Sequence, residues 1–228
     1  MSLLPSTNFE PKYLSKVTSW HPFLPFAYDL MIEVKPYIFV ELGTHWGDSY
    51  FTFCQSRKAN KLSTKCFAID HWEGDEHSGF YDNRVFESVY RYNEENYSSF
   101  SKLKRKRFEE AAIDFEDQSI DLLHIDGHHS LESINCDFKQ WIPKVKPHGL
   151  ILIHDTLVTK SDFGVFKFWE KISTKYLSYN FNFSFGLGLL RNCSNTEYQT
   201  LVNPIFDEII KSRYYQNVGQ KLVTVESR

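Results

Sequence analysis

Hydrophobic and polar positions follow two alternating rhythms along most of the chain. Short, nearly continuous apolar runs each lead into a polar or glycine-bearing turn, and longer stretches with helical periodicity separate them. The apolar runs are 37–42, 66–70, 120–126, 150–154 and 183–190. The helical stretches are 49–55, 84–95, 131–141 and 163–175. This alternation predicts parallel βαβ units whose strands are buried on both faces.

The order of these elements predicts an α/β fold with one main domain. Residues 1–36, rich in proline and aromatic side chains, are expected to form a lead-in with a short helix, and residues 37–228 the domain itself. A short third strand is expected near Phe108, and a helix over residues 203–215. Gly186 and Gly188, inside the last apolar run, indicate a hairpin edge or a close backbone approach.

Composition and charge narrow the classes of function. The formal net charge is −3, which does not favour a nucleic-acid partner, and the basic run at 102–107 is interpreted as a solvated surface. The four cysteines lack the close spacing of a zinc or redox motif, so reduced thiols are expected. Neither a secretory signal nor an apolar run of transmembrane length is visible. We therefore expect a cytoplasmic protein with no membrane span.

Candidate chemistry lies where the strands end, because open α/β sheets bind ligands at the carboxyl ends of their strands. The first strand ends in Glu41, and Gly43, Thr44 and Gly47 lead from it into a helix. Glycines permit a sharp turn, and N–H groups at the start of a helix can hold a carboxylate. The dinucleotide fingerprint is absent because Thr44 replaces its second glycine. Glu41 suits an amino group better than a diphosphate.

The alternative for this tip is an ordinary strand–turn–helix corner capped by Asp48 or Ser49. The second strand ends in Asp70, which follows the glycine-bearing turn at a distance that suits a contact with both ribose hydroxyls of an adenosine. An ordinary loop aspartate is the competing interpretation.

Two later strands bring carboxylates and imidazoles to one crevice. Asp126, His128 and His129 follow the first of them, and His154 and Asp155 end the second. Imidazole is the side chain most easily tuned to accept a proton near neutral pH. The two aspartates could hold a hard cation such as Mg²⁺. A single histidine is more often structural, but this density at two neighbouring tips favours a functional role.

Taken together, five runs resemble the class I S-adenosylmethionine-dependent methyltransferases. They are ELGTHWGDS, AIDHW, SIDLLHIDGHHS, PKVKPHGLILIHDT and FGVFKFWEKI, and the resemblance covers residues 37–190. More narrowly, they are similar to methyltransferase domain family 24, a bacterial branch found beside or fused to glycosyltransferases in surface-glycan pathways. The resemblance implies a Rossmann-like, doubly wound, mostly parallel seven-stranded sheet with an antiparallel last strand.

The resemblance also implies a binding site for S-adenosylmethionine. The implied cofactor contacts are Glu41, Gly43, Thr44, His45, Gly47, Ser49, Asp70, His71, Trp72, Ala112 and Asp126. Those of the first strand tip would surround the methionine end, and the aspartate of the second tip would take the ribose. His71 and Trp72 would lie near the adenine, with Ala112 on its other side.

Catechol-type and macrolide-sugar O-methyltransferases are similar in this region and place a Mg²⁺ ligand at the position of Asp126. By this resemblance His129 is the general base and Asp155 the second metal carboxylate. The chain departs from the pattern, because His154 stands where the metal-dependent relatives usually offer an acidic or amide ligand. His154 is therefore a second candidate base or a metal ligand.

The resulting prediction is methyl transfer from S-adenosylmethionine to a hydroxyl oxygen of a sugar, a glycan or another small acceptor. One alternative is a metal-dependent hydrolase that uses Asp126, His128, His129, His154 and Asp155. The other is a cofactor-binding module without activity.

Residues outside these tips are expected to serve the acceptor and the partners. Residues 73–83, with Trp72, Phe80 and Tyr81, are predicted to form the lid of the acceptor pocket. The first 35 residues are expected either to gate the site or to form a homodimer contact. Joint action with a glycosyltransferase is a further prediction.

Overall fold

A computed structural model of the chain describes residues 5–160, 162–194 and 212–225. The strands of its main sheet are β1 (Ile38–Leu42), β2 (Lys65–Asp70), β5 (Ser101–Arg105), β6 (Ile120–Ile125), β7 (Val145–His154), β8 (Tyr176–Phe181) and β9 (Leu187–Ser194). This seven-stranded sheet has the order β5-β2-β1-β6-β7-β9-β8. The first five strands in this order are parallel, and β9 runs antiparallel to both of its neighbours. The predicted fold class is confirmed.

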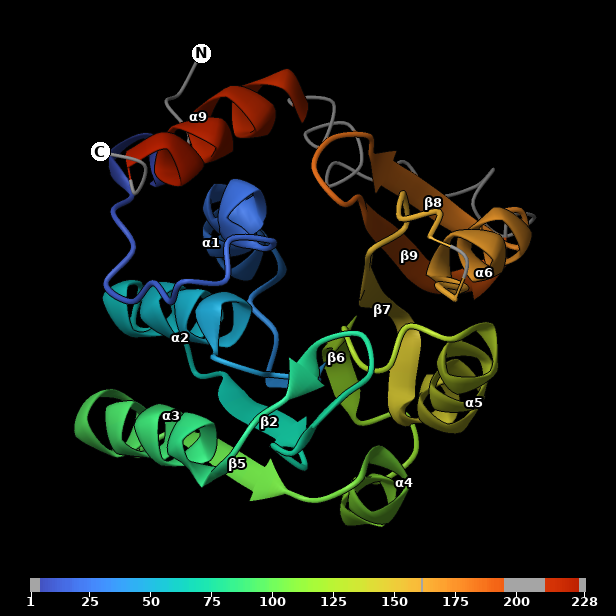
Figure 1. The fold of residues 1–228 in the computed structure, drawn as a ribbon, viewed down its shortest axis with the longest axis horizontal. Coiled ribbons are helices and arrows are strands. Elements are labelled where there is room, and N and C mark those ends of the chain that lie inside the picture. The colour runs from blue at the N-terminus through green and yellow to red at the C-terminus, as the bar shows by residue number, and fades with distance from the viewer. Residues whose placement is uncertain (1–4, 161, 195–211, 226–228) are drawn as a thin grey trace.

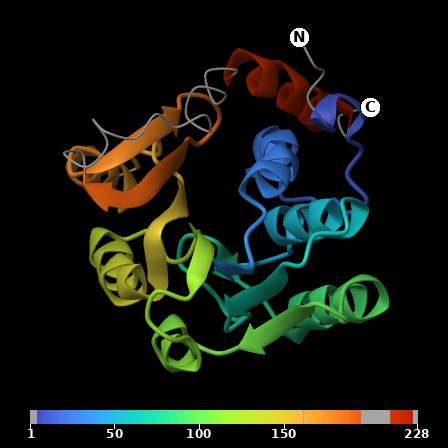
Figure 2. The ribbon, with the colours of Figure 1, turned by 180° about the vertical axis from the view of Figure 1, so that it is seen from behind.

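Helices cover both faces of the sheet (Figures 1 and 2). One face carries α1 (Leu24–Val34), α2 (Asp48–Ala59) and α3 (Asn83–Asn96), and the other carries α4 (Phe108–Ala111), α5 (Leu131–Trp141) and α6 (Val165–Ile172). Alternate strand residues enter opposite cores, as a period of two requires: in β1, Phe39 packs in the first core and Val40 in the second. Burial on both faces explains why the strands appear as continuous apolar runs.

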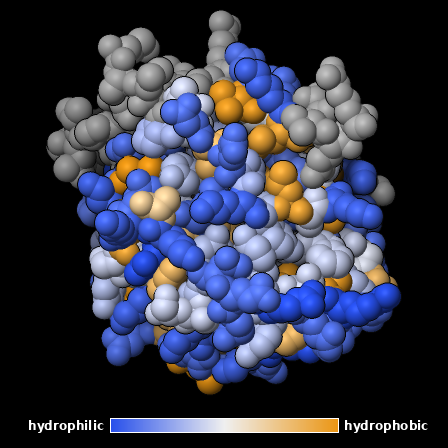
Figure 3. All heavy atoms as spheres, turned by 90° about the vertical axis from the view of Figure 1, so that its left-hand side faces the viewer, coloured by the Kyte–Doolittle hydropathy of each residue, from blue (hydrophilic) through white to orange (hydrophobic). Residues whose placement is uncertain are grey.

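The outer surface of the first helix layer is mainly hydrophilic. Figure 3 shows the side of the molecule that carries α2 and α3, where hydrophobic residues form small separate groups among polar ones. This is the pattern of amphipathic helices that bury one stripe against a sheet. Within the part of the chain that the structure describes, every helix is too short or too polar to cross a membrane.

The third strand differs from the prediction. Phe108 begins α4, and the strand is β5, formed by the basic run that we had interpreted only as a solvated surface. Along β5, Ser101 is buried, Lys102 and Arg105 are exposed, and the two residues between them are partly buried, as suits a strand at the edge of the sheet. Charged side chains on an edge strand discourage pairing with other chains, and here they hid the strand from a search for apolar runs.

The last hairpin matches the prediction in kind and differs in its bounds. The run 183–190 holds the turn and only the first half of β9. Gly186, with φ +84°, makes the turn, and Gly188 lies so close to Trp169 that a Cβ there would be 2.3 Å from the indole ring. The predicted helix over 203–215 lies outside the described residues up to 211. From Ser212 onward the chain is helical as α9 (Ser212–Val225).

The N-terminal segment is held along α2 before the chain enters α1. The Lys12 amide donates to Gln55 Oε1, and the Tyr13 hydroxyl donates to the carbonyl oxygen of Trp46. These bonds carry the chain over the first strand tip, where Trp20 and Phe23 enter the core. The short helix predicted in this segment is α1.

Both ends of the described chain meet on one carboxylate. Asp29 of α1 accepts hydrogen bonds from the Ser6 amide, from the Ser6 hydroxyl and, at 3.1 Å, from the Tyr215 hydroxyl of α9. Gly219 of α9 packs against Pro22, where a Cβ would lie 1.9 Å from the carbonyl oxygen. The helix α9 therefore backs the segment that carries Trp20.

Candidate active site

A cavity of about 1050 Å³ lies at the carboxyl ends of the central strands. It collects residues from every tip that the sequence singled out. The predicted site residues that line it are Gly43, Thr44, His45, Ser49, Asp70, His71, Asp126, His128, His129, His154 and Asp155. The predicted residues Glu41, Gly47, Trp72 and Ala112 do not line it.

The turn after β1 is shaped for close backbone approach. Gly43 has φ +83°, and a Cβ on it would lie 2.0 Å from the carbonyl oxygen of Asp126, so only glycine fits here. Gly47 is the N-cap of α2, with φ +92° and no side-chain cap. The alternative in which Asp48 or Ser49 caps the helix is therefore wrong. The uncapped N–H groups at the start of α2 can receive a ligand's carboxylate.

Asp48 holds the N-terminal segment against this turn. Its carboxylate accepts from the amide and hydroxyl of Ser15 at 2.7 and 2.6 Å, and it lies 3.0 Å from His21 Nε2. Val17 and Trp20, which lie within the segment fixed in this way, line the cavity. The lead-in is therefore part of the wall of the candidate site.

Asp70 anchors the same turn from the neighbouring strand. Its Oδ2 accepts from the amides of Thr44 and His45 at 3.0 and 2.9 Å, and its Oδ1 accepts from the amide of Trp72 at 2.6 Å. His45 and Trp72 both have positive φ, so the carboxylate stabilises two strained residues. Asp70 also lines the cavity, where its remaining lone pairs can accept hydroxyl groups.

Two predicted adenine neighbours lie elsewhere. Trp72 is fully buried and donates its indole N–H to the carbonyl oxygen of His45, so it supports the turn and is not part of a lid. Ala112 is buried in the second core, and on that side Phe108 lines the cavity instead. The lining beyond Phe108 continues onto α5 through Asp137.

Glu41 lies below the cavity. It shares a face of β1 with Phe39, is fully buried, and lies 2.8 Å from His124 Nδ1 on β6. Burial raises the pKa of Glu41 above its ordinary value, although the hydrogen bond from His124 opposes this. The pair connects the two strands that carry the glycine turn and Asp126.

Four titratable side chains meet at the tips of β6 and β7. His129 Nε2 lies 2.7 Å from Asp155 Oδ2 and 3.7 Å from Asp126 Oδ1. His154 Nδ1 lies 3.3 Å from a carboxylate oxygen of each aspartate. The ligand atoms of Asp126, His154 and Asp155 all lie within 4.8 Å of one another, which suits a divalent cation. An imidazole among the donors widens the choice from Mg²⁺ to transition metals such as Mn²⁺.

The two carboxylates control the charge of the histidines. Burial lowers the pKa of His129, but the hydrogen bonds with Asp126 and Asp155 outweigh it and raise the pKa to about 10. Burial also lowers the pKa of His154, and the charges of the same two aspartates raise it above its ordinary value. Burial raises the pKa of Asp126, and the facing imidazoles bring it well below its ordinary range. Facing only the two carboxylates, the imidazole of His129 therefore favours its protonated form, and a positive charge bound by those carboxylates would oppose this.

Several lining residues were missed by the sequence interpretation. Phe163 stacks on His129 with ring centroids 4.7 Å apart, and His77 contacts both rings from the segment after β2. Trp20 lies edge-on to His124 and tilted against His154. The only signal in the sequence was the density of aromatic and histidine residues in these segments, which does not tell which of them meet.

Comparison with known proteins assigns the class. The model of a methyltransferase domain family matches residues 40–156, which include all four strand tips described above. The protein y4gI of Sinorhizobium fredii is 43% identical over 190 residues, which make up 83% of this chain and 21% of y4gI. The chain thus spans about a fifth of the length of this relative.

Solved structures share the fold at low sequence identity. The O-methyltransferase TomG of Streptomyces achromogenes, in complex with S-adenosylmethionine, has a TM-score of 0.55 at 13% identity and covers 79% of this chain and 92% of its own. The Bacillus cereus O-methyltransferase, in complex with S-adenosylhomocysteine, has a TM-score of 0.56 at 13% identity and covers 82% and 85%. The methyltransferase PaMTH1 of Podospora anserina has 0.55 at 13%, with 82% and 83% covered.

The fold is shared with solved methyltransferases that bind S-adenosylmethionine or its product. The chain belongs to the methyltransferase domain family. The cofactor expected from the sequence, S-adenosylmethionine, is that of this class, and the cavity fits it in three respects. The uncapped start of α2 suits a carboxylate, Asp70 suits a ribose, and the buried Thr44 hydroxyl has no protein partner. The hydrolase alternative loses its support.

Proposed function

We propose that this domain transfers the methyl group of S-adenosylmethionine to a hydroxyl oxygen of a sugar, a glycan or another small hydroxylated acceptor, with His129 as the general base. The observation that supports it best is the hydrogen bond between His129 Nε2 and Asp155 Oδ2 at 2.7 Å, within the cavity that also holds the glycine turn. An O-methyltransferase needs a positioned base at this place, because the acceptor hydroxyl must lose its proton when the oxygen attacks the methyl carbon.

Methyl transfer needs two things from the site, which are alignment of donor and acceptor and removal of the acceptor's proton. The sulfonium already makes the methyl group reactive, so holding donor and acceptor in line supplies much of the rate. Asp126 and Asp155 orient the imidazole of His129, and Phe163 supports its ring. A divalent cation held by Asp126, His154 and Asp155 would supply Lewis-acid polarisation of the acceptor hydroxyl, and its charge would lower the pKa of His129 so that the imidazole could accept the proton.

The first experiment is calorimetric titration of the chelator-treated protein with S-adenosylmethionine, with and without Mg²⁺ or Mn²⁺. The protein is then assayed against a panel of methyl glycosides by release of S-adenosylhomocysteine. In His129→Ala, turnover should fall by about 10²–10⁴-fold while cofactor affinity stays unchanged. The exposed His148 is the matched control, and His148→Ala should leave both quantities unchanged. Equal turnover in His129→Ala and wild type would remove His129 from the mechanism.

The surroundings of the domain are part of the proposal. The sequence resemblance supports a glycosyltransferase as its working partner, and a homodimer stays a prediction. Three free thiols, Cys54, Cys66 and Cys136, support a reducing compartment such as the cytoplasm.

A further inference from the structure

A small hairpin crosses the mouth of the cavity. It follows β2 and consists of β3 (Gly74–Asp75) and β4 (Gly79–Phe80), and residues 73–78, 80 and 81 line the cavity. Its tip contacts residues that follow β6 and β7, whereas its base leaves the sheet at β2. Because β1 lies between β2 and β6 in the sheet, the hairpin spans the tip of β1, and Tyr81 at its end stacks on His45 of the glycine turn with ring centroids 4.9 Å apart.

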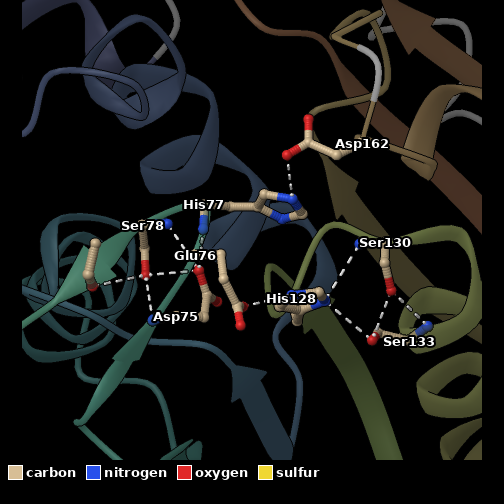
Figure 4. Close-up of polar contacts among 9 residues, drawn as sticks. Asp75, Glu76, His77, Ser78, His128, Ser130, Ser133 and Asp162 are labelled. Atoms are coloured by element: carbon tan, nitrogen blue, oxygen red, sulfur yellow. Dashed lines mark hydrogen bonds and ion pairs between the residues drawn. The ribbon is translucent and has the colours of Figure 1, made fainter.

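Two ion pairs hold the tip on the far side (Figure 4). His77 Nε2 lies 3.0 Å from Asp162 Oδ2, in the loop before α6, and Glu76 Oε2 lies 3.4 Å from His128 Nε2, in the loop before α5. The His77 ring also packs between two others, 4.7 Å from His128 and 4.6 Å from Phe163. The hairpin therefore touches both loops that flank His129.

The tip is rigid, but its attachments are weak. Asp75 Oδ1 accepts from the amides of His77 and Ser78 at 2.8 and 2.7 Å, which fixes the turn that presents His77. The two carboxylates that fasten the tip are largely in water, with Asp162 63% and Glu76 73% exposed. Pairs with a carboxylate in water are individually weak. The His77 side chain is only 6% exposed, so its pair with Asp162 and the packing of its ring must break together when the tip lifts. A rigid tip on weak attachments can open and close as a unit.

We propose that the β3–β4 hairpin is a latch over the bound cofactor, closed by the His77–Asp162 and Glu76–His128 pairs. S-adenosylmethionine enters and S-adenosylhomocysteine leaves only when the latch is open. The inference goes beyond a lid over the acceptor, because the hairpin spans the cofactor turn and is fastened both to the loop that carries His129 and to the loop whose Phe163 packs on it. It rests on the proposed function only in that the cavity binds these two molecules.

The test is the dissociation rate of S-adenosylhomocysteine, followed by the change in tryptophan fluorescence after the complex is mixed with excess S-adenosylmethionine. Glu76→Gln and Asp162→Asn remove one charge each and leave the fold intact. Each should raise the dissociation rate about two- to fivefold, and the double variant about tenfold. The matched control is Asp117→Asn, which removes the ion pair with Lys144. This pair lies just before the amino ends of β6 and β7, at the edge of the sheet opposite the cavity, and its loss should leave the rate unchanged.

Amide hydrogen exchange gives a second readout that does not need a ligand. In the free protein, residues 73–81 should exchange faster in the double variant than in wild type, with no change in α3. Dissociation rates equal to wild type in the double variant would overturn the latch. If the wild-type protein binds neither S-adenosylmethionine nor S-adenosylhomocysteine, the proposed function is contradicted. In that case the exchange experiment still tests the latch, and equal exchange of residues 73–81 in the double variant and wild type would contradict it.

Discussion

Replacing Asp70 tests whether this residue supports the fold as well as the ribose. In Asp70→Ala, the amides of Thr44, His45 and Trp72 lose a buried carboxylate acceptor. Hydrogen bonds to a charged group contribute about 1.5–3 kcal/mol each, and water would replace some of them after the change. The expected loss in the free energy of unfolding is therefore about 3–5 kcal/mol, a large part of the about 5–15 kcal/mol typical of a protein.

Thermal unfolding without ligand measures this loss directly. For a chain of this size, each kcal/mol of lost stability lowers the Tm by about 2–4 °C, so the expected loss corresponds to a fall in Tm of about 6–20 °C. Asp70→Asn keeps one acceptor oxygen for Thr44 and His45 and loses the bond from Trp72, so its Tm should fall by an intermediate amount. Asp117→Ala, at an exposed ion pair, should change the stability by less than about 1 kcal/mol.

Cofactor titration of the same variants separates the two roles of Asp70. If Asp70→Ala binds S-adenosylmethionine weakly but unfolds at the wild-type temperature, the carboxylate acts only on the ribose, and our reasoning about the turn is wrong. If Tm falls as expected and Asp70→Asn recovers part of it, the turn depends on the carboxylate before any cofactor binds.

Three further changes test the geometry of the site. Gly43→Ala should weaken cofactor binding by at least about 100-fold because its Cβ would meet the Asp126 carbonyl; a calorimetric affinity equal to that of wild type would contradict the clash. Asp155→Asn should lower the affinity of the chelator-treated protein for Mn²⁺ at least about tenfold, and unchanged affinity would remove Asp155 as a ligand. Burial, aided by Glu109, raises the pKa of Asp137 to about 7, so the folded state binds its proton more tightly than the unfolded chain and stability should fall as pH rises from about 4 to 7. Asp137→Asn should flatten that part of the Tm–pH curve and be more stable than wild type at pH 8; parallel curves would refute the assignment.

The fold was predictable because both faces of the sheet are buried. Strands such as β1 and β7 place apolar residues in both cores, so they stand out as unbroken runs. The edge strand β5 was missed because its basic residues give it the composition of a surface loop. The strand β8 lies at the other edge of the sheet. Most of its side chains are only partly buried and do not form an apolar run, so it was missed.

The candidate site was predictable only as far as strand tips can be read from the chain. Asp126, His129, His154 and Asp155 were expected to meet because neighbouring parallel strands end together, and they do. The face of the sheet on which a side chain lies depends on the register of its strand, and a shift of one residue moves every side chain to the opposite face. Contacts across distant segments, such as His77 with Asp162, depend on the path of the chain in space.

The sharing of Asp29 by Ser6 and Tyr215 bears on how this domain can be joined to other proteins. Because these two residues bond to the same side chain, the first described residues lie next to the start of α9, and the helix runs about 15 Å further to its end at Val225. A domain with neighbouring ends can be spliced into a surface loop of a host protein without stretching either partner. This junction is linked to the cavity, because α9 packs on Pro22, two residues from the Trp20 that lines it.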